Sequence, residues 1–335
     1  MSGDITVAIT GVEGYVPEHI LTNKDLEALV ETNDAWIMER VGIKERRILK
    51  DPEKASVYMG AEAVKGLLLK TNTHPNDVEL LICATVTGDY VVPDNANQIC
   101  KLAGMKHAYG FDLNAACSGF LFALATGAQF VRSGMHRKVI VVGSDKMSTI
   151  TDYTDRSTCI LFGDAAGAVM LEPSINDYGI EQIALYGDAS GKDMLRIKSG
   201  GALRPPSAET VGQREHFVWQ DGKVVFKAAV KGMSEAVKEV IKRAGHQGAD
   251  IDWIVPHQAN YRIIKSVADM LDYPLEKVMI NIQKYGNTTA ATIPLCLWEY
   301  ESKLKEGDKV ILTAFGGGYT WGAILLTWAY DTKKT

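Results

Sequence analysis

The sequence is poor in cysteine, and none of its cysteines is closely paired. Among 335 residues there are five, at positions 83, 100, 117, 159 and 296. No C-x-x-C spacing occurs, so neither a disulfide framework nor a cysteine-ligated zinc site is indicated. An odd, scattered set is typical of reduced thiols. We therefore expect free thiols and no metal.

The sequence also lacks long runs of basic residues and long runs of apolar residues. The net charge is −5 and no extended basic segment occurs, which argues against a nucleic-acid partner. No apolar stretch is long enough to span a membrane and the N-terminus lacks a signal-peptide pattern, so we expect a cytoplasmic protein without a membrane partner. Gly316–Gly322 is not a dinucleotide fingerprint, because Trp321 occupies its last glycine position, and we expect no cofactor.

The two halves of the chain resemble each other, which points to an internal repeat. The matching segments are Val78–Cys83 with Ile251–Pro256, Gly110–Cys117 with Met279–Thr289, Val139–Gly143 with Val310–Ala314, and Gly163–Met170 with Gly318–Leu325. Their apolar runs are continuous, as in strands buried between helical layers. The pattern predicts two packed α/β halves, residues 1–173 and 174–335, with the functional site where they meet.

Cys117 is a candidate nucleophile. It ends a short apolar run, and the residues after it have the spacing of a buried helix face. A cysteine at a helix start faces unpaired N–H groups and the positive end of the helix dipole, which favour the reactive thiolate. The alternative is a small buried apolar residue, as many free cysteines are.

Three downstream features strengthen the nucleophile hypothesis. His257 follows a predicted strand, Asn287 precedes an apolar helix, and Gly316–Gly318 follows a second strand. Residues at the ends of such elements can converge although they are distant in sequence. The alternatives are a surface or core histidine, an asparagine that caps the following helix, and a plain turn.

Seven motifs in order resemble one family, the β-ketoacyl-acyl-carrier-protein synthases III of the thiolase-like superfamily. They are Ala35–Arg47, Asp112–Gly119, Thr154–Arg156, Phe162–Asp164, Pro256–Asn260, Gly286–Thr288 and Ala314–Gly322. The resemblance covers nearly the whole chain. It implies a thiolase-like duplicated fold, with two α/β halves in a layered αβαβα arrangement.

The resemblance also implies an activity. Cys117 would take an acyl group from acyl-CoA, and malonyl-acyl-carrier protein would then lose CO2 and attack the thioester, giving 3-oxoacyl-acyl-carrier protein. The backbone N–H groups of Cys117 and Gly317 would form the oxyanion hole, and His257 and Asn287 would donate to the malonyl thioester oxygen. We expect the helix start, rather than His257 as a strong base, to activate Cys117.

Binding residues follow from the same resemblance. Trp36 and Arg156 would sandwich the CoA adenine, with Thr32 and Arg40 nearby. The pantetheine tunnel would be lined by Phe226, Asn260 and Phe315. Otherwise, Trp36 is a core residue and Arg40 a solvated helix charge.

Two pairs of basic residues could bind the acidic carrier protein. Lys227 and Lys231 are one helical turn apart, as are Arg262 and Lys265, so each pair lies on one helix face. Ordinary solvated surface charge is the alternative for all four.

Acetyl selectivity is in doubt because Val92 precedes Pro93 at the position where many acetyl-selective members of the family carry phenylalanine. A smaller residue in the acyl pocket predicts primers larger than acetyl. In the family arrangement the segment Thr85–Pro93 lies near the partner subunit of a homodimer. The polar segment Leu195–Val218 is expected to be an irregular loop that shapes the entrance.

Three other functions remain open. The first is a thiolase-like condensing enzyme or acyltransferase of secondary metabolism with the same trio. The second is a cysteine acyl hydrolase, which forms no carbon–carbon bond. The third is a non-enzymatic scaffold, against which the intact Cys117, His257 and Asn287 argue.

Overall fold

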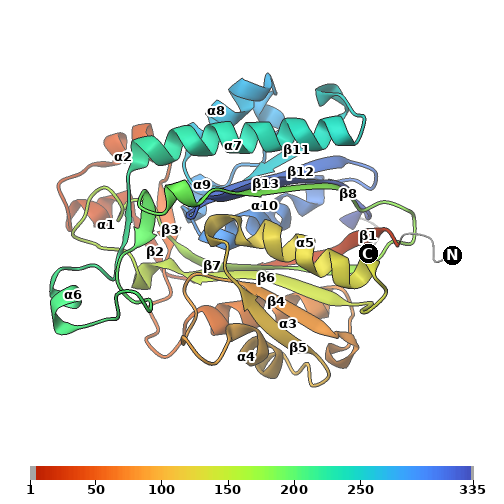
Figure 1. Cartoon of the computed structure of the whole chain (residues 1–335), viewed down its shortest axis with the longest axis horizontal. Helices are drawn as coiled ribbons and strands as arrows, with labels where there is room; N and C mark the ends of the chain where they lie inside the picture. The colour runs from red at the N-terminus through yellow and green to blue at the C-terminus, as the bar shows by residue number, and fades with distance from the viewer. Residues whose placement is uncertain (1–4, 333–335) are drawn as a thin grey trace.

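The computed structural model describes residues 5–332, and two stacked β-sheets dominate them (Figure 1). The strands of the first sheet, in spatial order, are β1 (Val7–Tyr15), β7 (Asp164–Pro173), β6 (Val139–Lys146), β4 (Leu80–Ala84) and β5 (Tyr109–Leu113). Those of the second are β8 (Ile180–Gly187), β13 (Thr320–Thr327), β12 (Lys309–Gly316) and β11 (Trp253–Pro256).

The strand order confirms the duplication. In each sheet one parallel pair is followed by two antiparallel neighbours: β4 and β6, then β7 and β1 in the first, β11 and β12, then β13 and β8 in the second. The repeat is incomplete at one edge, because Met279–Thr289 does not form the predicted counterpart of β5. Its place is taken by a single bridge between Val278 and Ile254. The domain boundary at residue 173 stays a prediction.

Helices fill three layers around the two sheets, as the predicted αβαβα arrangement requires (Figure 1). One outer layer holds α3 (Ser56–Lys70) and α4 (Asn95–Leu102), the middle layer α5 (Gly119–Arg132) and α10 (Thr292–Tyr300), and the other outer layer α7 (Gly222–Arg243) and α8 (Tyr261–Leu271). Smaller elements beside these layers are β2 (Ile20–Thr22), α1 (Asn23–Glu27), α2 (Asp34–Val41), β3 (Glu45–Arg47) and α9 (Ile282–Tyr285).

The middle layer explains the continuous apolar runs. Phe120 and Leu124 of α5 are fully buried, in one core cluster with Val141 of the first sheet and Leu312 of the second. A helix between two sheets has no solvent face, so its apolar residues surround it. The starts of α5 and α10 are therefore held deep inside the protein, where the halves meet.

The segment Leu195–Val218 is more regular than predicted. Its ends form a two-stranded ribbon and its tip carries a short helix: β9 (Leu195–Ile197), β10 (Val218–Gln220) and α6 (Ala208–Gly212). The N–H of Val218 donates to the Ile150 carbonyl at 2.8 Å. This bond fastens the ribbon to the loop between β6 and β7.

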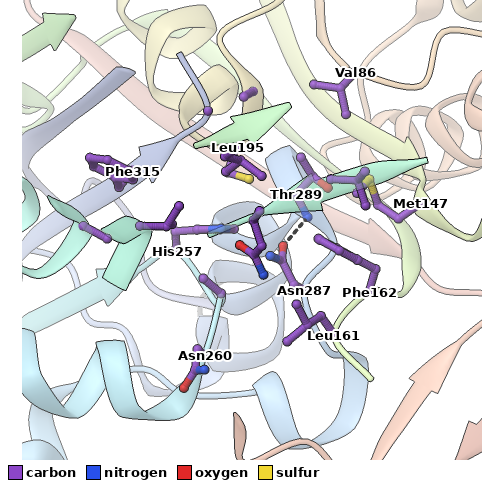
Figure 2. A pocket seen from close by; sticks show the side chains of 18 of the residues that line it. Val86, Met147, Leu161, Phe162, Leu195, His257, Asn260, Asn287, Thr289 and Phe315 are labelled. Atoms are coloured by element: carbon purple, nitrogen blue, oxygen red, sulfur yellow. Dashed lines mark hydrogen bonds between the residues drawn. The ribbon is translucent and has the colours of Figure 1, made fainter. Parts of the chain in front are cut away.

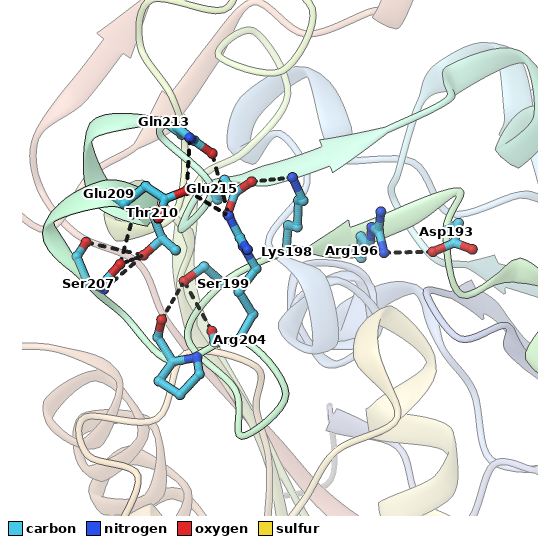
Figure 3. A network of polar contacts seen from close by, with 11 residues as sticks. Asp193, Arg196, Lys198, Ser199, Arg204, Ser207, Glu209, Thr210, Gln213 and Glu215 are labelled. Atoms are coloured by element: carbon cyan, nitrogen blue, oxygen red, sulfur yellow. Dashed lines mark hydrogen bonds and ion pairs between the residues drawn. The ribbon is translucent and has the colours of Figure 1, made fainter.

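Glu215 stabilises the ribbon (Figure 3). Its buried carboxylate accepts hydrogen bonds from Arg204 and Lys198. These partners, Arg204 first, hold the pKa of Glu215 below its usual range. Nearby, Nε of Arg214 donates to Asp152 at 2.7 Å, which ties the ribbon to the first half. The ribbon is thus an ordered wall beside the functional site.

Among residues 5–332, no helix is both long and apolar enough to cross a membrane.

Candidate active site

A cavity of about 380 Å³ lies between the two halves. Cys117 lines it from the first half, and His257, Asn287, Phe315 and Gly317 line it from the second. Figure 2 shows His257 and Asn287 among the side chains that line this largely apolar space. The three predicted catalytic side chains therefore share one cavity, together with the predicted oxyanion glycine.

Cys117 sits in a tight turn directly before α5. The turn spans Ala116–Ser118, and Ala116 has a positive φ of 49°. A Cβ on Gly316 would lie 2.8 Å from the Cys117 nitrogen, so only glycine allows β12 to approach this closely. Thr320 donates to the Ala115 carbonyl at 2.9 Å, which ties the turn to β13. The second half therefore holds the nucleophile in place.

Burial disfavours the thiolate form of Cys117. The side chain is partly accessible from the cavity. Desolvation, followed by the charge of Asp145, raises the pKa of Cys117 to about 12. Desolvation and the backbone donor act on this pKa in opposite directions, and desolvation is the larger of the two. Activation of Cys117 by the helix start stays a prediction.

This pKa predicts how Cys117 reacts with iodoacetamide. We expect alkylation to accelerate about tenfold per pH unit from roughly pH 7 to pH 10 without a plateau, because only the thiolate reacts and its fraction keeps rising below the pKa. Intact-mass spectrometry over time measures the rate, with Cys117→Ser as the control. A plateau near neutral pH would show that the thiolate already exists at rest.

His257 is a buried, neutral histidine. Its Nδ1 lies 2.7 Å from the Thr292 hydroxyl, a short distance typical of an O–H donor. Thr292 Oγ1 also lies 3.1 Å from the Thr289 carbonyl, to which it can donate. A role of His257 as donor to substrate requires the hydroxyl to donate to Nδ1 instead, which leaves the ring proton on Nε2. Burial lowers the pKa of His257 to about 3, so the ring stays uncharged.

Asn287 is oriented by its own turn. Its Oδ1 accepts the Thr289 N–H at 2.9 Å, the dashed line in Figure 2. Because the oxygen is engaged, the NH2 group is the part of the amide left to donate into the cavity. Capping of the following helix therefore uses only Oδ1 of Asn287 and leaves its Nδ2 available for a second role. His257 and Asn287 thus form a pair of neutral donors.

Asp145 and Thr292 belong to the site but went unrecognised in the sequence. Asp145 is fully buried and accepts hydrogen bonds from Thr85, Val86 and Thr87 and from the Ala290 N–H. Desolvation raises its pKa to about 6. An acidic residue after a continuous apolar strand was a signal for Asp145. No sequence signal marks Thr292, because threonine at a helix start is ordinary.

The predicted CoA-head residues cluster but do not line the cavity. The guanidinium carbon of Arg156 lies 5.1 Å from the centre of the Trp36 ring, and that of Arg40 lies 5.5 Å away. In this structure the Arg156 guanidinium itself covers the Trp36 ring through a cation–π contact, and the predicted adenine sandwich between these two residues stays a prediction. A purine would have to displace the guanidinium. Nearby, Thr32 Oγ1 is buried without a hydrogen-bond partner among residues 5–332.

The remaining predicted tunnel residues are at the cavity. Phe226, Asn260 and Phe315 all line it. The guanidinium of Arg262 lies 5.9 Å from the Phe226 ring, which places this cation at the side of α8 that meets α7. Asn260 caps α8 by accepting the Arg262 N–H at 2.8 Å. One basic residue is thus directly adjacent to the cavity wall.

The four predicted basic residues differ in their surroundings. All are exposed. Lys265 pairs with Asp269 at 2.7 Å, and Lys231 lies 3.9 Å from Glu235, each within its own helix. Part of this positive charge is therefore neutralised locally, and exposed pairs of this kind are weak.

Val92, predicted to border the acyl pocket, lies outside the cavity of its own subunit. It does not line the cavity, and its exposure is 83%. It lies between β4 and α4, beside Val91 with 97% exposure. The loop turns these side chains outward, so Val92 cannot fill the pocket of the same chain.

Known proteins match this chain along its whole length. A family model described as 3-oxoacyl-[acyl-carrier-protein (ACP)] synthase III matches residues 111–189, and its C-terminal counterpart matches residues 241–328. Beta-ketoacyl-[acyl-carrier-protein] synthase III 1 of Bacteroides thetaiotaomicron is 49% identical over 330 residues, covering 98% of each chain. The enzyme of that class from Chlorobium chlorochromatii is 50% identical over 325 residues, which is 96% of this chain and 99% of that one.

Solved structures agree. The crystal structure of 3-oxoacyl-[acyl-carrier-protein] synthase III from Aquifex aeolicus VF5 has a TM-score of 0.88 and 41% identity, covering 96% of this chain and all of that one. The protein of Pseudomonas aeruginosa PAO1 has a TM-score of 0.89 and 36% identity, covering 98% of this chain. Fold, site and sequence all point the same way, and this chain belongs to the β-ketoacyl-[acyl-carrier-protein] synthase III family.

Proposed function

We propose that this enzyme condenses an acyl-CoA primer with malonyl-acyl-carrier protein through an acyl-Cys117 intermediate, the step that initiates fatty-acid synthesis. The products are 3-oxoacyl-acyl-carrier protein, CoA and CO2. The observation that carries the proposal is the shared cavity, in which a nucleophile faces two neutral hydrogen-bond donors. The names of the relatives favour this reaction over a secondary-metabolism acyltransferase.

Loading exchanges one thioester for another. The Cys117 sulfur attacks the acyl-CoA carbonyl, the bond to the CoA sulfur breaks, and the thiol proton is finally carried by CoA. The developing oxyanion accepts hydrogen bonds from the N–H groups of Cys117 and Gly317. Because the pKa of Cys117 is about 12 at rest, deprotonation accompanies the attack rather than preceding it. No metal or further cofactor is needed for this exchange.

During condensation, negative charge develops on the malonyl thioester oxygen instead of on the acyl carbonyl oxygen. Loss of CO2 from the malonyl group leaves an enolate whose oxygen accepts from His257 Nε2 and the Asn287 NH2 group. One such donor is worth roughly 3–4 kcal/mol of barrier. The enolate carbon then attacks the acyl-Cys117 carbonyl and forms the new carbon–carbon bond. The thioester bond to Cys117 breaks, and the leaving thiolate takes up one proton from solvent to restore the thiol. Neutral donors suit this step because they stabilise the enolate without protonating it fully.

The substrates reach the site along the α7–α8 side. Phe226, Asn260 and Phe315 would contact pantetheine, while Lys227, Lys231, Arg262 and Lys265 would meet the carrier protein. The CoA head would bind at Trp36, Arg40, Thr32 and Arg156, with the purine replacing the Arg156 guanidinium on the indole face. This exchange of one flat partner for another loses little stacking energy.

Intact-mass spectrometry tests the function. After incubation with acetyl-, isobutyryl- or octanoyl-CoA, we expect one acyl adduct, on Cys117. Addition of malonyl-acyl-carrier protein should remove the adduct and yield an equal amount of 3-oxoacyl-carrier protein. An adduct that is released only to water would instead identify a hydrolase.

Val92 bears on primer choice through a second copy of the chain. The exposed Val91 and Val92 would be covered in a homodimer, where Val92 could close the partner's acyl pocket. Val92→Phe should then depress kcat/KM for octanoyl-CoA while sparing acetyl-CoA, in a graded way because one methylene is worth about 1–3 kcal/mol. Val91→Phe is the matched control. A fully active monomer in sedimentation, or an unchanged primer profile, would contradict this arrangement.

A further inference from the structure

Arg46 is a buried cation that the reaction does not use directly. It lies on β3 with 0% exposure. Nε and Nη2 both donate to the Ile160 carbonyl, at 3.2 and 2.5 Å, and Nη1 donates to Asn23 Oδ1 at 2.6 Å. Within residues 5–332, no carboxylate forms an ion pair with it. Burying a guanidinium among neutral partners costs free energy, so its contacts need an explanation.

The Ile160 carbonyl belongs to the segment that holds Asn287. One residue on, the Leu161 carbonyl accepts the Asn287 N–H at 2.8 Å. Two residues further, the Gly163 N–H donates to the Asn287 carbonyl at 3.1 Å. The segment Ile160–Gly163 therefore holds the backbone of Asn287 on both sides.

The aliphatic part of the Arg46 side chain packs at the point where the segment that contains Gly163 crosses the segment that contains Gly286. A Cβ added to Gly163 would lie 3.3 Å from Arg46 Cβ and 2.4 Å from the Tyr285 carbonyl. A Cβ added to Gly286 would lie 3.2 Å from Arg46 Cγ and 2.7 Å from the Leu161 carbonyl. The two chain segments cross without space between them, and Arg46 packs against both.

A second arm of the same network reaches α2. Asn23, which accepts from Arg46, donates through Nδ2 to Asp34 Oδ1 and to the Ile43 carbonyl, both at 2.8 Å. Asp34 is the first residue of α2, the helix that carries Trp36. Arg46 thus connects the candidate CoA platform with the Asn287 segment.

We propose that Arg46 is a positioning residue for condensation, which holds the Ile160–Gly163 segment and through it the amide of Asn287. The inference rests on the proposed role of Asn287 as a donor to the enolate. Cys117 and Gly317 lie on elements that the Arg46 guanidinium does not touch. Loss of the guanidinium should therefore impair the second half of the reaction more than the first.

Three variants test the proposal. Arg46→Met removes the guanidinium but keeps the stem, Arg46→Lys keeps the charge but not the fork, and Arg47→Met is the control in the same strand, where the arginine lies 3.5 Å from Glu45. Single-turnover mass spectrometry measures acyl transfer from acyl-CoA to Cys117. A second assay measures condensation of pre-acylated enzyme with malonyl-acyl-carrier protein.

We expect Arg46→Met and Arg46→Lys to load Cys117 within about threefold of wild type but to condense about tenfold to a hundredfold more slowly, as small misplacements of a catalytic group do. Arg47→Met should leave both rates unchanged. If Arg46→Met does not fold, Arg46→Lys decides alone. Equal losses in both half-reactions, or normal condensation, would overturn the proposal. Asn287→Ala distinguishes the Arg46 proposal from the proposed function, because normal condensation by that variant would overturn the proposed function itself.

Discussion

Cys117→Ala is expected to form no acyl-enzyme. The other four cysteines cannot replace it, because Cys83, Cys159 and Cys296 have 0% exposure and Cys100 has 3%. None of them lines the cavity. Incubation with acyl-CoA followed by intact-mass spectrometry should show the unmodified mass, whereas wild type gains one acyl group.

The same variant offers an internal control. His257 and Asn287 are untouched in Cys117→Ala, so some decarboxylation of malonyl-acyl-carrier protein should survive and can be followed as CO2 release. Residual decarboxylation shows that the variant is folded. An acylated Cys117→Ala protein would contradict the assignment of Cys117 as the nucleophile.

His257→Ala and Asn287→Ala should each separate the two half-reactions. Both variants should still load Cys117, because the backbone N–H groups of the oxyanion hole are unaffected. Condensation should fall roughly a hundredfold or more in each, the usual effect of one lost donor. Rates of adduct formation and of 3-oxoacyl product formation, measured on the same preparations, check the separation. His107→Ala, at an exposed histidine, is the control.

The pH profile adds a second readout. Burial lowers the pKa of His257 to about 3, so the ring remains neutral down to that value and protonates only below it. Condensation should accordingly show no loss from His257 between about pH 5 and pH 8, although an ordinary histidine titrates near 6.5. A His257→Ala or Asn287→Ala enzyme that fails to load but condenses pre-acylated protein normally would reverse the division of roles.

The sequence by itself determined the fold class and the location of the site. Continuous apolar runs repeated in two halves are required by strands and helices buried on all sides, and the structure confirms the repeat in its strand order. Cys117, His257 and Asn287 were found because each stands at the end of an apolar element, and ends of neighbouring elements converge in a layered fold. The roles of these residues stay predictions.

Only the tertiary structure decided how the groups behave. The pKa of Cys117 depends on desolvation by residues far along the chain, which no local pattern reveals, and this desolvation opposes the expected thiolate. Arg156 covers Trp36, and Val92 points outward, because contacts across the fold and loop direction are not encoded in motif spacing. Arg46 was noted only as part of the Ala35–Arg47 motif, and its burial against the Ile160 carbonyl arises from packing between segments more than a hundred residues apart.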